Sequence, residues 1–461
     1  MVENKDINKF VIKWGGSILV FLLCLYLASN LSMSYTPDEI MRYRVPYFIF
    51  ENGHLPFGNE LALRDPSWGF SYAYTPYLPS LIASVFMRIT SLFTLDQNAI
   101  LLSARLVSVF SAAFTWLLCY SIGEKLFKNQ FYSLFLCILV CFLPQFIFVS
   151  SYLNNDSFSI MLGALIIDLW LAGDRYKWKK SICIELGISL GMLALTYYNA
   201  YGFILASVLF CLVSARQNKI SWEDIGMRVL IVITSAFIVC GWFFVRNLIL
   251  HGDVLGMNTM YSEGELYAID ALKMSNRATP QRLGYSIIDS LTTKDFIGVS
   301  WIESTMNSFI GMFGYMSISL QDGFYNSYKV IIGVGFFIGI LSWGIQCLRR
   351  RKKWFLFISL LLCMIVPFIL SIKYSYTIDY QPQGRYLLSM LVPLMIFTVE
   401  GFKILFGRLF RFKGSSLVNI TIVAIYIGLF LHTYFTIMVP LQRSNDGLVN
   451  NEMKEIISTY Y

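Results

Sequence analysis

The stretch "SYTPDEIMRY", residues 34–43, follows directly on the first long apolar run of the chain and decides how the rest is interpreted. That run, about residues 12–33, is long enough to cross a bilayer and longer than the apolar core of a secretion signal. We therefore interpret it as a retained membrane helix. Asp38 and Glu39 are then two adjacent carboxylates just beyond the edge of the lipid, a position that calls for a structural or functional reason.

The composition is that of a membrane protein. Of the 461 residues, 56% are hydrophobic and 14% are charged, and the mean hydropathy is +0.61. Soluble domains carry about 25% charged residues, so a soluble globular protein is excluded. All nine cysteines lie in apolar segments, which indicates neither a disulfide framework nor a cysteine-based metal site. We expect no cofactor, and a divalent metal is not indicated.

The positive charges predict the topology. They cluster in short loops, which are residues 125–128, 175–180, 216–219, 349–353 and 408–413. If the N-terminus is inside and all of the roughly twelve apolar stretches cross the membrane, these loops lie outside, against the positive-inside rule. If 75–94 does not cross, every cluster lies inside. The sequence therefore predicts an all-α integral membrane protein with about eleven transmembrane helices, the N-terminus in and the C-terminus out.

One membrane domain is predicted over residues 1–461, with two long segments outside the lipid. The first outer loop covers residues 34–98 and carries the interfacial helix at 75–94. A large outer loop covers residues 246–328. Loops of this length are usually functional, so we expect the site in them.

Three acids are candidates for chemistry on the outer face. Asp38 and Glu39 follow a proline and could simply cap a helix. Alternatively, Asp38 is a general base at the membrane surface, where low dielectric raises a carboxylate pKa. Asp156, after Asn154 and Asn155, is again either a helix cap or a second acid of an enclosed outer site.

Arg385, preceded by Gly384 at the outer mouth of a predicted span, is either a snorkelling side chain or a phosphate ligand. A guanidinium suits a phosphate because it can donate two hydrogen bonds at once. Arg64, Arg246 and Arg277 compete for the same role. The candidates for contact with an acceptor or another site are His54, Asn155 and Tyr386.

Several function classes lack their motifs. The sequence has no phosphate-binding G-x-x-x-x-G-K-[ST] loop, no G-x-S-x-G elbow and no H-E-x-x-H. Charged residues inside the predicted spans, such as Asp168, Glu185 and Glu400, lie near span ends. Ion-coupled transporters usually need such groups at mid-membrane, so that class is disfavoured. The basic loops fit membrane topology and do not indicate nucleic acid.

Four segments in order carry a family resemblance: "TPDEIMRYRVPYFIFENGHLP", "YTPYLPSLI", "SARLVSVFSAAFTWLLCYSIGEKLF" and "FLPQFIFVSSYLNNDSF". With the topology, they resemble the GT-C superfamily of membrane glycosyltransferases, which includes protein O-mannosyltransferases and aminoarabinose transferases. The later "SFIGMFGYM" and "QGRYLLSMLVP" are more similar to one bacterial branch of poorly characterised multi-spanning proteins. Unlike the better-known families, this chain has no evident large soluble domain after its last predicted span.

The resemblance implies an inverting glycosyltransferase that uses a polyprenyl-phosphate-linked sugar on the outer face of the bacterial plasma membrane. It implies that Asp38 is the base, that Glu39 orients the site, that Asp156 is a second acid and that Arg385 stabilises the leaving phosphate. The expected partners are the lipid-linked donor, membrane lipids and a glycan or lipid-linked acceptor, with a cell-envelope glycan favoured. Two alternatives remain open: a polymerase or ligase of the O-antigen type, and a flippase or transporter for lipid-linked sugars.

Overall fold

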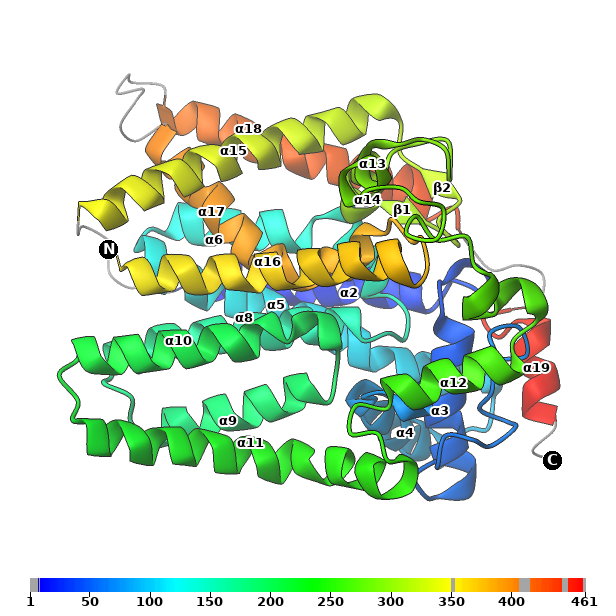
Figure 1. The fold of residues 1–461 in the computed structure, drawn as a ribbon. Helices are drawn as coiled ribbons and strands as arrows, with labels where there is room; N and C mark the ends of the chain where they lie inside the picture. Colours follow the sequence, from blue (N-terminus) through cyan, green and yellow to red (C-terminus); the bar gives the residue numbers. More distant parts are fainter. Residues whose placement is uncertain (1–6, 8, 350–352, 406–414, 442–446, 459–461) are drawn as a thin grey trace.

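The computed structural model describes residues 7, 9–349, 353–405, 415–441 and 447–458. Long helices lie side by side in a bundle, and most of the remaining elements gather at one end of it (Figure 1). The bundle helices are α2 (Gly16–Ala28), α5 (Gln97–Phe127), α6 (Gln130–Cys141), α8 (Asp156–Arg175), α9 (Lys180–Ala194), α10 (Gly202–Gln217), α11 (Trp222–His251), α15 (Asp322–Leu348), α16 (Trp354–Thr377), α17 (Leu391–Ile404) and α18 (Ser415–Thr433).

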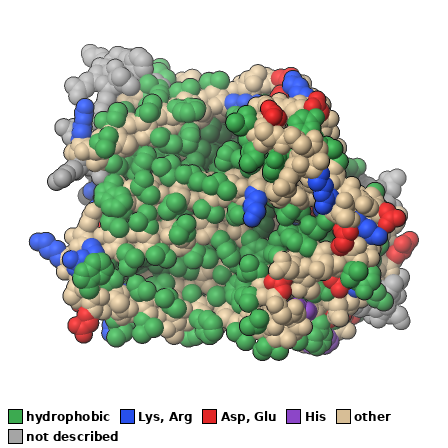
Figure 2. Space-filling model, in the orientation of Figure 1, with side chains coloured by type: hydrophobic (Ala, Val, Ile, Leu, Met, Phe, Trp, Pro, Cys, Tyr) green, Lys and Arg blue, Asp and Glu red, His purple; other side chains and the backbone are tan. Residues whose placement is uncertain are grey.

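Within the described ranges, nine helical stretches are long and apolar enough to cross a membrane. Two shorter helices also belong to the bundle. Helix α6 packs on α5 and α17, and helix α9 packs on α8 and α11. Hydrophobic side chains cover the middle of the bundle, while charged ones gather towards its ends (Figure 2). The prediction of an all-α, multi-spanning membrane protein is confirmed. The small exception is a hairpin of two two-residue strands, β1 (Met312–Phe313) and β2 (Ile318–Ser319).

One end of the bundle, which we call the loop-rich end, collects both long predicted loops (Figure 1). The elements there are α3 (Glu39–Asn52), α4 (Leu78–Ser91), α12 (Met257–Tyr267), α13 (Ile287–Thr292), α14 (Trp301–Ile310), the β-hairpin and α19 (Asn451–Ser458). With 14 residues, α4 is about 21 Å long, shorter than the roughly 30 Å apolar core of a bilayer. It packs on α3 and α5, as expected for the predicted interfacial helix.

The basic loops meet at the opposite end. Asp174, just before the end of α8, accepts a hydrogen bond from Ser214 at 2.8 Å and pairs with Lys353. Lys125 pairs with Asp168 at 2.6 Å. Clusters that are far apart in the sequence therefore share one end of the bundle, in agreement with the charge argument for topology.

Glycine allows two bundle helices to approach closely. Gly335 and Gly339 of α15 face α17, where Gly401 lies against the backbone of Gly335. A Cβ atom added at Gly339 would lie 1.9 Å from the carbonyl oxygen of Phe397. Small residues spaced in this way bring membrane helices together, since lipid offers no hydrophobic driving force between them.

Gly339→Ala should therefore destabilise the protein by about 1–3 kcal/mol, because the α15 and α17 backbones must separate. Gly333→Ala on the same helix is the matched control, since a Cβ there meets nothing within 4 Å. Thermal unfolding of both variants in detergent checks this. Equal melting temperatures for the two would contradict the close approach.

The C-terminal segment returns to the first loop. The backbone N–H of Met33 donates to Leu448 at 3.0 Å, and Asn98 accepts a hydrogen bond from the N–H of Leu448 at 3.0 Å. Glu452 of α19 lies 3.7 Å from the buried guanidinium of Arg44 in α3. Leu448, Val449, Met453 and Ile457 are all buried in the main core. Segments from both ends of the chain thus hold the residues around Asp38.

Candidate active site

Asp38 occupies the position before α3 but does not cap the helix. Its backbone is left-handed, with φ at 60°, and its side chain makes no cap hydrogen bond. The carboxylate instead accepts a hydrogen bond from Nη2 of Arg385, whose Nη1 also donates to the carbonyl of Pro37 at 3.4 Å. The side chain is 32% exposed. Its geometry favours a role in a site over a role in the helix end.

Asp156 reaches the same guanidinium from the start of α8. Asn154, two residues before α8, holds the start of this helix, because its Oδ1 accepts the N–H groups of Asp156 at 2.8 Å and of Ser157 at 3.3 Å. Oδ2 of Asp156 lies 3.8 Å from Nε of Arg385. Oδ1 of Asp156 is buried and has no hydrogen-bond partner among the described residues. Arg385 thus stands between two carboxylates, one of which keeps an unused acceptor.

Arg42 adds a second cation. It lies one helical turn after Asp38, and its guanidinium carbon is 4.4 Å from the centre of the Tyr72 ring. Burial works to raise the pKa of Asp38, but the charges of Arg385 and Arg42 and the hydrogen bond from Arg385 hold it below the usual 3.8. The expectation of a raised pKa at this position is wrong, because two guanidinium groups outweigh desolvation.

The cluster opens on a cavity of about 360 Å³. Asp38, Arg42 and Arg385 line it together with Lys373, an exposed residue near the end of α16. A smaller cavity of about 80 Å³ adjoins it, and Arg277 is among the residues that line this smaller cavity. Asp38 borders both cavities and so stands where two bound groups could meet.

Glu39 is fully buried and is held by four hydrogen bonds. Nε and Nη2 of Arg105 donate to its two oxygens at 2.8 and 2.6 Å. The hydroxyl of Thr36 donates at 2.6 Å and the N–H of Leu153 at 2.9 Å. Arg105 also donates to the carbonyls of Ala28 and Leu31. This network ties the segment before α3 to the segment before α8, and thereby fixes Asp38 relative to Asp156.

The other predicted residues divide between this site and its surroundings. Asn155 and Tyr386 line the larger cavity, and the side chain of Asn155 donates to the carbonyl of Thr196 at 2.7 Å. Arg64 is outside both cavities and pairs with Glu263 at 2.8 Å. Arg277 pairs with Asp379 at 3.4 Å.

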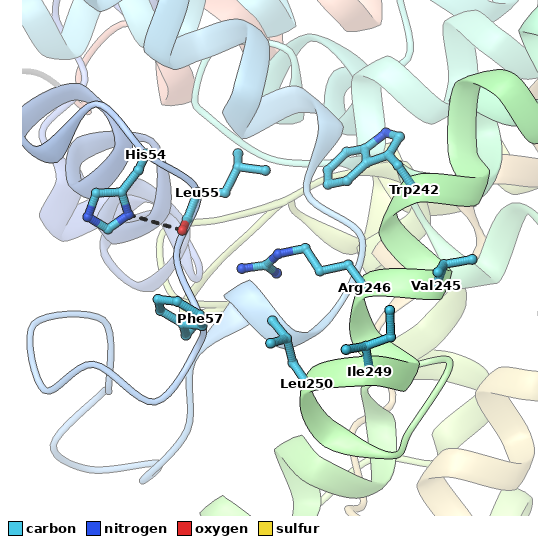
Figure 3. Close-up of a pocket in the computed structure, with 8 residues that line it drawn as sticks. All are labelled: His54, Leu55, Phe57, Trp242, Val245, Arg246, Ile249 and Leu250. Atoms are coloured by element: carbon cyan, nitrogen blue, oxygen red, sulfur yellow. Dashed lines mark hydrogen bonds between the residues drawn. The ribbon is translucent and has the colours of Figure 1, made fainter.

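His54 and Arg246 lie in a separate groove of about 650 Å³ (Figure 3). The residues lining that groove include none of those lining the two cavities at Asp38.

Three further residues belong to the site and were not predicted. Arg42 stands in the opening sequence motif, four residues after Asp38, and helical spacing could have indicated it. Arg105 is a lone charge within an otherwise apolar span, which is itself a signal of function or pairing. Lys373 had no distinguishing signal, because a lysine near a span end usually snorkels.

Most of the chain matches one family of known sequences. Residues 62–395 match the model of a family described as "Predicted membrane protein (DUF2142)". The chain belongs to this family. No curated protein matches the chain.

Two solved proteins have a fold similar to that of this DUF2142 member. The oligosaccharyltransferase AglB of Archaeoglobus fulgidus, in complex with an inhibitory peptide and a dolichol-phosphate, is similar with a TM-score of 0.58 at 12% identity, over 97% of this chain and 59% of that one. Another structure of that enzyme, tethered to an acceptor peptide, gives 0.58 at 12% identity, over 96% and 56%. ArnT of Cupriavidus metallidurans, bound to undecaprenyl phosphate, gives 0.54 at 10% identity, over 96% and 74%. This chain thus spans little more than half the length of the archaeal enzyme. The fold of this chain is thus similar to the folds of the archaeal oligosaccharyltransferase and of ArnT.

Proposed function

We propose that this protein is an inverting glycosyltransferase that moves a sugar from a polyprenyl-phosphate donor to a hydroxyl group of a cell-envelope glycan. The observation that carries the proposal is the cluster of Asp38, Asp156, Arg42 and Arg385 at the mouth of a cavity. It combines a partly exposed carboxylate with cations suited to a phosphate, which are the two groups that this reaction needs. The GT-C fold adds support.

In the proposed reaction, the acceptor oxygen attacks the anomeric carbon of the donor sugar. Asp38 takes the proton of the acceptor hydroxyl as the new bond forms. The bond between the anomeric carbon and the phosphate oxygen breaks, and its electron pair leaves with polyprenyl phosphate. Arg385 and Arg42 stabilise the negative charge that develops on that phosphate.

The pairing of Asp38 with Arg385 gives donor binding a second effect. A phosphate in the cavity would compete with Asp38 for the Arg385 guanidinium. The cationic neighbours that lower the pKa of Asp38 would then act on the phosphate, so Asp38 would become a stronger base. On this view the base is activated when the donor is in place.

The charges around the larger cavity favour a donor with one phosphate. The cations Arg42, Arg385 and Lys373, taken with the carboxylates of Asp38 and Asp156, leave a single positive charge. A sugar–phosphate–lipid diester carries one negative charge and would balance it. A diphosphate linkage carries two and would leave a buried excess of negative charge, which is costly.

The site is proposed to face the outside of the bacterial plasma membrane. The basic loops lie at the other end of the bundle, where Lys125 and Lys353 make ion pairs. Such loops normally remain cytoplasmic. A lipid-borne donor can be used only near the membrane surface, which accounts for paired acids at the edge of the first span.

Purified protein incubated with a panel of lipid-linked sugars should release free polyprenyl phosphate from a monophosphate donor. Turnover with the matching diphosphate donor should be at least about tenfold lower, because the site holds one unbalanced cation. Lys373→Gln should raise KM for the monophosphate donor, whereas Lys329→Gln, at a lysine lining neither cavity, should not. Mass spectrometry of the lipid product measures each rate. A flippase would release no free polyprenyl phosphate, and a polymerase that uses diphosphate donors would reverse the preference.

A further inference from the structure

Arg246, near the end of α11, has a partly buried guanidinium without a carboxylate partner among the described residues. Arg44, Arg64, Arg277 and Arg385 each have a carboxylate oxygen within 3.7 Å. Among the residues that the structure describes, none pairs with Arg246 in this way. Its Nη2 donates to the carbonyl of Pro56, and its buried Nη1 has no hydrogen-bond partner in the same set. A shielded guanidinium without a counter-charge is costly, so it calls for an anion.

The surroundings of Arg246 are mostly apolar. The groove of about 650 Å³ is lined by His54, Leu55 and Phe57 on one side and by Trp242, Val245, Ile249 and Leu250 of α11 on the other, so that His54 is the one polar side chain in its walls besides Arg246. Figure 3 shows the guanidinium extending from α11 into the space between these walls. Its carbon lies 5.8 Å from the centre of the Phe57 ring. An anion that binds here must bring apolar groups with it.

Arg246 lies near the end of a helix that faces lipid. It stands five residues before His251, the last residue of α11, which places it about 8 Å below the end of that helix. The apolar residues Phe237, Ile238, Trp242 and Ile249 of α11 are exposed. This helix therefore faces lipid, and the charged end of a neighbouring lipid would lie beside Arg246.

We propose that this groove binds one anionic phospholipid, with its phosphodiester on Arg246 and its acyl chains along α11. The single cation balances the single charge of a phosphatidylglycerol. A zwitterionic lipid would also bring an ammonium group into a groove with apolar walls, where it gains no comparable partner. The site is separate from the proposed active site, and its occupancy does not depend on the proposed reaction.

Native mass spectrometry of delipidated protein with added phosphatidylglycerol tests the proposal. Wild type should retain one lipid molecule at about a tenfold lower concentration than Arg246→Gln, the loss expected for a charge-assisted hydrogen bond. Arg88→Gln is the matched control, because Arg88 is an exposed arginine that packs on Phe50 and lies outside the groove. It should bind like wild type. Arg246→Lys, which keeps the charge, should be intermediate and serves if Arg246→Gln fails to fold.

Four results would overturn the proposal. Equal lipid retention by Arg246→Gln and wild type would show that Arg246 does not bind the lipid. An equal loss of lipid in Arg88→Gln would show that the effect comes from the general surface charge. Phosphatidylethanolamine that binds as tightly as phosphatidylglycerol would contradict the charge match. Inorganic phosphate at millimolar concentration should not compete, since competition would indicate a site for a free anion.

Discussion

Asp38→Asn should lower turnover by about 10²–10⁴-fold, the usual contribution of a general base, while donor binding persists. Asparagine keeps the size of the side chain and tolerates the left-handed backbone that Asp38 adopts, so the fold should survive. Turnover, KM for the donor and the melting temperature should be measured together. The loss should fall on turnover alone.

Asp96→Asn is the control that separates catalysis from capping. Asp96 caps α5, since its side chain accepts the N–H of Ala99 at 3.0 Å. Asparagine caps about as well as aspartate, so this variant should be unchanged in every measurement. If Asp38→Asn were equally active and stable, Asp38 would not be the base, and the case for a transferase would lose its main residue.

The lowered pKa also predicts the shape of the pH profile. A carboxylate whose pKa is depressed in the folded protein stays ionised above its usual pKa, and any stability from its ion pairs is lost only as the pH falls below that value. The kcat/KM profile should therefore show no limb from Asp38 between about pH 5 and pH 8.

Arg105→Met should reduce the free energy of unfolding by about 3–5 kcal/mol, the typical cost of removing one partner from a buried ion pair. The substitution leaves the fully buried Glu39 without its counter-charge, and the carbonyls of Ala28 and Leu31 lose their donor. Thermal unfolding in detergent should show a large drop in melting temperature, and expression should fall.

Lys125→Met is the matched control for this prediction, because the Lys125–Asp168 pair is also within the bundle but is partly exposed, at 23% and 15%. Its loss should cost about 1 kcal/mol or less. The double variant Glu39→Gln with Arg105→Met should lose less unfolding free energy than the two single variants lose together, because the two side chains share one network. Full additivity would show that Glu39 and Arg105 are not coupled.

The topology could be predicted because charge and length are local properties of the sequence. The basic loops predicted that 75–94 does not span, and α4 lies beside α3 at the loop-rich end of the bundle. The same parity argument placed Asp38, Asp156 and Arg385 at one end. It could not predict that Arg385 lies between the two acids, because that contact joins the residue before α3, the first residue of α8 and the 3-10 helix Gly384–Met390 before α17.

The electrostatics of the site could not be predicted for a related reason. A carboxylate at a membrane surface is expected to have a raised pKa, and only the proximity of two guanidinium groups reverses the sign. Glu39 shows the same limit. The resemblance implied that Glu39 orients the site, but the sequence did not indicate its partner Arg105, which lies 66 residues further along the chain and pairs with it in the core.

The return of the C-terminal segment to the first loop sets a time for the completion of the site. The pairing of Met33 with Leu448 and of Arg44 with Glu452 joins parts of the chain that are made roughly four hundred residues apart. At about 5–20 residues per second, these partners emerge some 20–80 s after the segment that they hold. During synthesis the segment around Asp38 therefore lacks its contacts with Leu448 and Glu452 until the last bundle helix has been inserted.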